Sequence, residues 1–437
     1  MKRISETTEP LQAIAMKSSP IRIVSSTDAA QMRRLFTRRA QRLDEAERAV
    51  TPIIRAVRRE GDRALLRYAR RWDGFQGTAA DLAVSRSQIA SAKLAVPAAF
   101  RKAVAAAARN VRRYCRQQMP REWRMETQPG VRVGQLLRPL DSVGCYIPAG
   151  RYPLPSTLLM TAIPAQVAGV QRVVVVTPHP VPEILTVADA LGIQEVYRAG
   201  GAQAVAALAY GTKTIQPVAK IVGPGNAYVA AAKRIVSRDA GIDFVAGPTE
   251  VLLIAKDGNP AWLAADLLAQ AEHDQDATAL LLTPSKQLAT QVAAAVAAQL
   301  PSLPPGSPAA ASLRKNGAIV IVHDLEEAVA LANRFAPEHL SVPAGVALKK
   351  IRSAGSVFVG PFSPEAAGDY ASGPNHVLPT GGMARLRGGL SVLDFLKIIS
   401  VQQLGREGLR RLAPSITSLA RGEGLEAHAR SVEIRLK

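Results

Sequence analysis

The sequence predicts an α/β protein in which two Rossmann-like parallel-sheet domains face a cleft, with a helical N-terminal segment and a helical C-terminal tail. After Pro139, short apolar runs alternate with segments of helical periodicity, which is typical of parallel strands covered by helices on both faces. The pattern occurs twice without a close sequence repeat, and this predicts two such units. A chain of 437 residues is also longer than one hydrophobic core usually supports.

The N-terminal third shows mainly helical periodicity. Residues 1–20 start with basic residues and contain only a short apolar stretch, so we expect a disordered extension rather than a secretory signal. Apolar residues at helical spacing over 40–71 and 96–116 predict helices. We therefore expect residues 21–143 to form a helical part that packs with the second α/β unit.

The two α/β units and the tail follow in order. The first unit is expected over residues 144–247, with strands at 144–147, 172–176, 195–198 and 220–222 and helices at 156–168, 182–191, 202–209 and 227–237. The second is expected over residues 248–390, with strands at 251–255, 279–282, 318–322 and 356–359 and helices at 260–273, 286–297 and 325–335. A loop is expected over 301–312, and residues 391–437 are expected to form a helical tail.

Composition and charge exclude several classes of protein. No apolar run approaches the ~18–20 residues that a membrane span needs. The two cysteines, Cys115 and Cys145, make no disulfide framework, which favours a reducing cytoplasm and a buried, inert Cys145.

Residues 1–140 hold 29 Lys and Arg against 12 Asp and Glu, which accounts for +17 of the net charge of +20. We interpret this as a solvated arginine-rich surface without a specific nucleic-acid partner, because aromatic residues are sparse and no nucleic-acid-binding motif occurs.

Glycine-bearing turns follow three predicted strands of the first unit. They are Tyr146-Ile147-Pro148-Ala149-Gly150, Gly200-Gly201-Ala202-Gln203 and Gly223-Pro224-Gly225-Asn226. Each one alone is equally consistent with a plain tight turn. Glycines between a strand and a helix allow close backbone approach and leave helix N–H groups free for a phosphate. Because the turns share one sheet edge, together they predict a nucleotide site.

Polar residues in the second unit and the tail suggest a metal site. Gln270 and His273 are three positions apart, so they share a helix face. Together with Asp369 and His428 they offer oxygen and imidazole donors that suit Zn²⁺. Asp266 and Asp274 are alternative oxygen donors. A packed or capping histidine is the alternative interpretation of His273.

A carboxylate and an imidazole adjoin at Glu338-His339, after a predicted helix. Neighbours on an extended loop point apart, so the two groups need not bond to each other and can serve two protons at two places around one substrate. Histidine titrates near neutrality, and burial raises a glutamate toward it. A polar helix end with a capping histidine is the alternative.

Together these segments resemble the histidinol dehydrogenase family, in the family's order over residues 30–433. Besides the turns and the pairs above, the matching segments are Ala246-Gly247-Pro248-Thr249-Glu250, Gln270-Ala271-Glu272-His273, Ala336-Pro337-Glu338-His339-Leu340, Asp369-Tyr370-Ala371-Ser372-Gly373-Pro374-Asn375-His376-Val377-Leu378-Pro379-Thr380 and Ala427-His428-Ala429.

The resemblance implies a cytoplasmic enzyme that oxidises L-histidinol to L-histidine through L-histidinaldehyde with two NAD⁺, the last steps of histidine biosynthesis. It implies one Zn²⁺ per subunit, which positions the substrate, and a homodimer in which the tail of one subunit completes the site of the other. The zinc ligands implied by the resemblance, which also contact substrate, are Gln270, His273, Asp369 and His428. Further substrate contacts are Thr249, His339 and Glu423, and NAD contacts are Tyr146, Gln203 and Asn226. His339 is implied as the general base and Glu338 as the group that activates water.

The sequence departs from the family pattern at three places, one of which is the stretch 151–155 beside the predicted cofactor edge. Ala149 stands where members often have glycine, at a turn beside the expected NAD site, and Thr249 replaces a common serine but keeps the hydroxyl. A same-fold NAD-dependent dehydrogenase of another primary alcohol is the main alternative. Zinc hydrolysis without NAD and weak nucleic-acid binding are further alternatives.

Overall fold

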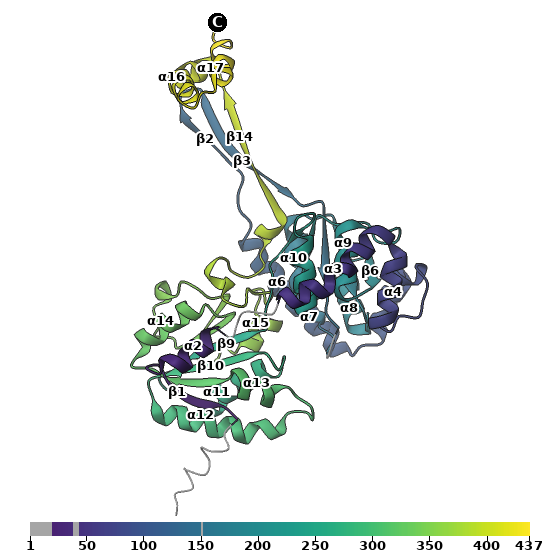
Figure 1. Cartoon of the computed structure of the whole chain (residues 1–437), viewed down its shortest axis with the longest axis vertical. Helices are drawn as coiled ribbons and strands as arrows, with labels where there is room; N and C mark the ends of the chain where they lie inside the picture. The colour runs from purple at the N-terminus through teal and green to yellow at the C-terminus, as the bar shows by residue number, and fades with distance from the viewer. Residues whose placement is uncertain (1–19, 38–42, 150–151) are drawn as a thin grey trace, which may run out of the picture.

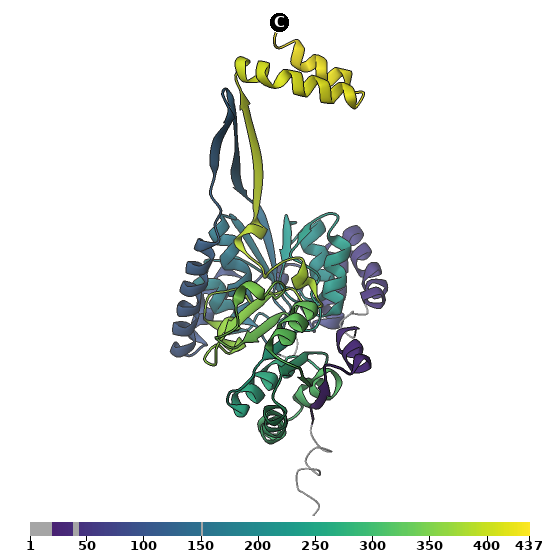
Figure 2. The ribbon, with the colours of Figure 1, turned by 90° about the vertical axis from the view of Figure 1, so that its left-hand side faces the viewer.

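The computed structural model describes residues 20–37, 43–149 and 152–437. The extension expected over 1–20 lies, apart from Pro20, outside these residues, as does Gly150 of the first glycine-bearing turn. Two α/β units form a body, and a narrow arm projects from it and carries the C-terminus (Figure 1, Figure 2). In the described part of the chain, no helix combines the length and apolar character needed to cross a membrane.

The first unit contains a five-stranded parallel sheet in the order β6-β5-β4-β7-β8. The strands are β4 (Ser142–Tyr146), β5 (Arg172–Thr177), β6 (Glu195–Arg198), β7 (Lys220–Val222) and β8 (Gly241–Ile242). Helices cover both faces: α5 (Arg86–Ser91), α6 (Ala98–Gln117), α7 (Pro155–Ala168) and α8 (Pro182–Ala190) on one, and α3 (Leu43–Glu60), α4 (Asp62–Trp72), α9 (Gly201–Tyr210) and α10 (Ala227–Val236) on the other.

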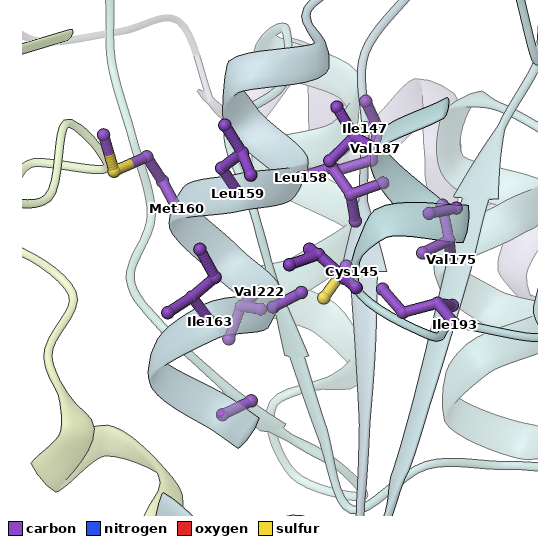
Figure 3. Packing of buried hydrophobic residues seen from close by; sticks show 14 of the residues in the cluster. Cys145, Ile147, Leu158, Leu159, Met160, Ile163, Val175, Val187, Ile193 and Val222 are labelled. Atoms are coloured by element: carbon purple, nitrogen blue, oxygen red, sulfur yellow. The ribbon is translucent and has the colours of Figure 1, made fainter. Parts of the chain in front are cut away.

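Successive residues of these strands enter opposite cores. Val175 packs with α7 and α8, whereas its neighbours Val174 and Val176 pack with the helices of the other face. Figure 3 shows the first of these clusters, with Cys145 among Leu158, Val222 and other apolar side chains. Burial raises the pKa of the Cys145 thiol to about 12, so the expectation of a buried, unreactive cysteine is confirmed.

The second unit contains a six-stranded parallel sheet in the order β1-β11-β10-β9-β12-β13. The strands are β1 (Arg22–Ser25), β9 (Glu250–Ile254), β10 (Thr278–Thr283), β11 (Ala318–Ile321), β12 (His339–Val342) and β13 (Ser356–Val359). Helices α11 (Pro260–Ala271), α12 (Lys286–Gln299) and α13 (Ala309–Asn316) cover one face, and α2 (Ala29–Thr37) and α14 (Leu325–Phe335) cover the other. The short helix α15 (Glu365–Tyr370) follows β13.

The arm is a three-stranded antiparallel sheet that ends in two helices. Its strands, in the order β14-β3-β2, are β2 (Trp123–Gln128), β3 (Val131–Pro139) and β14 (Leu396–Leu404). The helices α16 (Arg406–Gly422) and α17 (Glu426–Glu433) lie across its far end (Figure 2). Arg421 of α16 forms ion pairs with Glu426 and Glu433 of α17, which hold the two helices together.

The predicted α/β class is confirmed, and all eight expected strands occur with ends shifted by at most two residues. The tail expected to be wholly helical over 391–437 instead starts with β14, whose partner β3 lies in the part expected to be helical. Strand β12 was not expected because its apolar run is short, yet it occupies an interior position beside β9. Helix α13 begins inside the loop expected over 301–312.

The N-terminal segment divides between the units. Residues 21–143 are expected to pack with the second unit, and β1 and α2 do so. Helices α3, α4 and α6 instead pack on helices of the first unit, because their apolar stripes belong to its two cores.

Candidate active site

A strained turn leads into the strand that carries the predicted catalytic pair. Helix α14 ends at Ala336, whose left-handed backbone (φ 54°, ψ 66°) is the one positive φ outside glycine in the described residues. For a residue with a Cβ this conformation costs about 1–2 kcal/mol, and such strain tends to occur at functional sites. The turn reverses the chain so that Glu338 and His339 enter the sheet at the start of β12.

Glu338 is fixed by two hydrogen bonds to its Oε2 atom. The Thr249 hydroxyl donates at 2.5 Å and the Glu250 backbone N–H donates at 2.8 Å. Burial raises the pKa of Glu338 to about 7, although His339 and these two donors act in the opposite direction. The carboxyl group is therefore poised to exchange a proton near neutral pH.

His339 lies among acidic groups. Its Nδ1 is 3.2 Å from the Glu250 carbonyl oxygen and 3.7 Å from Glu338 Oε2, and its Nε2 is 3.4 Å from Asp369 Oδ1. Glu338 and His339 lie closer together than neighbours on an extended segment would, in an ion-pair contact that is too long for a hydrogen bond. Burial opposes protonation, but the Glu338, Asp369 and Glu365 carboxyl groups raise the pKa of His339 to about 10.

Helix α15 supplies two of these carboxyl groups. Glu365 and Asp369 are four residues apart and so share one face of the helix. Burial raises the pKa of Glu365 to about 8. Burial also raises that of Asp266, to about 6. The pKa of Asp369 is lowered despite burial, because the His339 imidazole lies 3.4 Å away and His376 and His273 add positive charge nearby. The site thus concentrates more acidic groups than nearby histidines can neutralise.

Gln270 connects this acidic cluster to Thr249. Its side-chain amide lies 2.5 Å from Thr249 Oγ1, and its other end is 3.1 Å from Glu365 Oε2. With the amide oxygen toward Glu365, two oxygen atoms face each other, and either a proton on Glu365 or a cation must lie between them. With the amide reversed, the nitrogen donates to Glu365 and the oxygen accepts from the Glu250 N–H, while the single hydrogen of the Thr249 hydroxyl goes either to this oxygen or to Glu338. The first orientation of the Gln270 amide allows a cation to bind beside the two oxygen atoms. The second orientation satisfies the amide by hydrogen bonds within the protein when no cation is bound.

The donor set fits a divalent cation on chemical grounds. A buried surplus of carboxylates, an amide oxygen that can turn toward Glu365, and a buried Glu365 Oε1 atom without a hydrogen-bond partner in the described residues all favour added positive charge. His273 is exposed, one residue beyond the cap of α11. Within the described part of this single chain, no three His, Cys, Asp or Glu side chains converge in a metal-binding group.

The predicted catalytic residues lie at the amino ends of β9 and β12. His339 begins β12 opposite Val251, and Thr249 precedes β9. Parallel sheets usually bind ligands at the carboxyl ends of their strands, so these residues lie at the opposite edge of their sheet. The chain returns along α11, which brings Gln270 from the carboxyl edge back to the amino edge.

The predicted cofactor residues line one cavity of about 790 Å³. Tyr146 ends β4, Gln203 lies in the first turn of α9, and Asn226 caps α10 by accepting the N–H groups of Tyr228 and Val229. This confirms that the three glycine-bearing turns meet at the carboxyl edge of one sheet. Helices α3 and α4 close the cavity with residues that include Tyr68, Trp72 and Asp73.

Gly223 is required where the third turn meets the first. Its φ of 119° is one that residues with side chains rarely adopt, and a Cβ there would overlap the Tyr146 carbonyl oxygen. The close approach sets Asn226 beside Tyr146 in the cavity wall.

Glu423 and His428 lie apart from the other predicted residues. Glu423 caps the end of α16 and His428 lies in α17; both are exposed at the far end of the arm. Figures 1 and 2 show α16 and α17 distant from β9 and α15. Within one chain these two residues therefore do not join Asp369.

Two residues of the site were not predicted from the sequence. Glu365 could have been recognised from its four-residue spacing to Asp369. Asp73, in the wall of the cofactor cavity, follows an arginine-rich helix and has no neighbouring motif that would have drawn attention to it.

Comparison with known proteins identifies the family. The family model for histidinol dehydrogenase matches residues 36–436. A histidinol dehydrogenase of Brucella abortus (strain 2308) is 49% identical over 401 residues, which cover 90% of this chain and 93% of that protein. One from Methanothermobacter thermautotrophicus is 46% identical, covering 95% and 99%. The crystal structure of histidinol dehydrogenase from Elizabethkingia anophelis superposes with a TM-score of 0.91 at 38% identity and covers 96% of this chain and 98% of that one. The chain therefore belongs to the histidinol dehydrogenase family.

Proposed function

We propose that this protein oxidises L-histidinol to L-histidine through L-histidinaldehyde with two NAD⁺, in the cytoplasm, as the last steps of histidine biosynthesis. The observation that carries the proposal is the buried pair of Glu338 and His339 beside Asp369, with a separate nucleotide-sized cavity at the edge of the other sheet. Family membership supports the reaction class.

His339 and Glu338 would divide the proton transfers. His339 would take the proton of the substrate hydroxyl as hydride leaves its carbon for the nicotinamide ring. Glu338 would take a proton from the water that adds to the aldehyde, giving the hydrate that a second hydride transfer converts to the acid. Such groups each contribute roughly 10²–10⁴-fold in rate. Thr249 holds Glu338 in place through its hydroxyl.

Gln270, His273 and Asp369, with His428 of a second copy, would hold zinc. When bound, zinc would supply a fixed positive charge and a binding position for the substrate's imidazole and amine. Positive charge next to Asp369 would also lower the pKa of His339, which three carboxyl groups otherwise keep protonated at neutral pH. His339 could then accept a proton.

Tyr146, Gln203 and Asn226 would bind NAD⁺ at the carboxyl edge of the first sheet. Separate anchoring of cofactor and substrate allows the first NADH to leave while the reactive aldehyde stays bound. The cavity wall contains the Tyr68 and Trp72 rings, stacked with centroids 4.9 Å apart, which offer a flat surface for an aromatic ring.

The arm supports a homodimer with shared sites. It leaves large apolar side chains exposed, and exposed apolar side chains that gather on one part of a protein often mark a binding surface. They are Trp123, Met125, Ile398, Ile399, Leu419 and Ile434. A two-fold arrangement would let each arm carry Glu423 and His428 to the other subunit's site and bury these side chains. The contacting Trp262 and Phe362 rings, both exposed on the second unit, offer an apolar surface on the body.

The decisive experiment counts NADH formed per L-histidinol consumed, before and after chelation and after zinc is restored. Two NADH per substrate, lost on chelation and regained with zinc, is the expected result. One NADH per substrate would show release of the aldehyde or a simple alcohol dehydrogenase. No NADH with zinc bound would refute histidinol as substrate and favour another primary alcohol.

A further inference from the structure

The amide of Gln203 is held in one orientation. The side chain is buried, 1% exposed, and its Nε2 donates to Asp73 Oδ2 at 3.1 Å. The same Asp73 oxygen accepts the Gly200 backbone N–H at 3.1 Å. Because a carboxylate accepts and does not donate, Asp73 selects the nitrogen end of the amide and turns the oxygen end away.

The Gln203 oxygen is left as an unused acceptor. Oε1 is buried, and within the described residues no donor reaches it. A Cβ on Gly201 would lie 2.8 Å from this atom, so the glycine keeps the space beside it open. A buried acceptor without a donor is costly, and a ligand N–H that reached it would recover that cost.

Tyr146 offers the opposite polarity next to this oxygen. Its hydroxyl oxygen accepts the Gly201 N–H at 3.0 Å, so the oxygen is fixed while its own hydrogen can be donated. An acceptor, Gln203 Oε1, and a donor, the Tyr146 hydroxyl, thus both lie next to Gly201. Both residues belong to the lining of the cofactor cavity.

We propose that Asp73 is a positioning residue for cofactor recognition: it fixes Gln203 so that Gln203 Oε1 and the Tyr146 hydroxyl together bind a ligand edge that has an N–H beside an acceptor atom. The inference rests on the proposed use of NAD⁺. The dinucleotide has two such edges, the 6-amino group with N1 of adenine and the carboxamide of nicotinamide. Both edges present the same chemistry to the pair.

The test is the equilibrium affinity of the full-length, zinc-loaded protein for three dinucleotides, measured by calorimetry. These are NAD⁺, the hypoxanthine analogue, which lacks the 6-amino group, and the 3-acetylpyridine analogue, which lacks the carboxamide N–H. For the wild type, we expect one analogue to bind about tenfold or more weakly than NAD⁺, since a buried acceptor loses its donor. We expect the other to bind within about threefold of NAD⁺. The weaker analogue identifies the edge.

Variants at two positions test the role of Asp73. Asp73→Ala frees the amide to rotate, so we expect NAD⁺ affinity to fall to that of the weaker analogue and the discrimination between them to disappear. Asp73→Asn keeps an oxygen for both hydrogen bonds and should keep the discrimination. Gln203→Met should lose it. Circular dichroism melts establish that each variant folds. If Asp73→Ala does not fold, the other two variants decide.

Three results would overturn the inference: NAD⁺ bound normally with neither analogue discriminated, full discrimination in a folded Asp73→Ala protein, or lost discrimination in a folded Asp73→Asn protein. Wild-type protein that binds no dinucleotide at all would instead refute the use of NAD⁺ in the proposed function, and the inference with it.

Discussion

The buried ion pair between Lys233 and Asp243 should be one of the larger single contributions to stability in the first unit. Both side chains are at most 3% exposed. Lys233 Nζ donates to the Gly223 carbonyl oxygen at 3.0 Å, and Asp243 Oδ2 accepts the Gly223 N–H at 2.8 Å. The pair therefore binds both polar backbone groups of the glycine that starts the third turn of the cofactor cavity.

We predict that Lys233→Met lowers the free energy of unfolding by about 3–5 kcal/mol, because it leaves the Asp243 carboxylate buried without its cation. A matched control is Lys315→Met, which breaks an exposed pair with Asp276 and should cost at most about 1 kcal/mol. Adding Asp243→Asn to Lys233→Met removes the buried charge but keeps an acceptor for Gly223, and it should restore part of the loss.

Urea denaturation followed by circular dichroism compares the midpoints of the four proteins, and calorimetry measures NAD⁺ affinity in the folded variants. The affinity should fall in Lys233→Met and stay unchanged in Lys315→Met. A Lys233→Met midpoint no lower than that of the control would refute the reasoning, since it would mean that burial of the unpaired carboxylate has no cost.

Further predictions concern the reaction and the shared site. Glu338→Gln should slow the aldehyde-to-acid half-reaction by about 10²-fold or more and the first oxidation less; equal loss in both halves would contradict the role in activating water. Because burial raises the pKa of Glu338 to about 7, its ionised form, and with it the rate of the second half-reaction, should increase as pH rises through about 7, and the variant should lack this step. His339→Asn should retain NAD⁺ binding while kcat falls, so unchanged turnover would argue against the base. Verified heterodimers of His428→Ala and His339→Asn chains should regain activity through one intact site, and failure to do so would exclude a site shared between subunits.

The sequence predicted the sheets well because their signals are local. Strands such as 172–177 and 220–222 contain short apolar runs between helical segments, and a glycine lies close to one end of each. The three glycine-bearing turns could be assigned to one sheet edge from strand direction alone, without knowledge of the strand order.

The arm and the details of the site depend on contacts between distant residues. Ile398 and Ile399 are mostly exposed, so β14 lacks a buried face that would reveal a period of two, and its partner β3 lies about 260 residues earlier. Glu338 and His339 follow a left-handed residue, Ala336, and an alanine in the sequence gives no sign of that backbone conformation. Asp73 bonds to Gln203, which lies 130 positions away in the sequence.

The pairing of β14 with β3 also has a consequence for the order in which the chain folds. Strand β3 is synthesised before either sheet of the body is complete, and β14 leaves the ribosome only after both units. Until then, the nine residues of β3 form an unpaired edge of the hairpin of β2 and β3. Unpaired strand edges tend to pair with other chains and aggregate. Such long-range pairing is slow to form. Maturation of the arm should therefore be a late event, and truncation within residues 396–404 should yield protein that has both α/β units folded but is prone to aggregation.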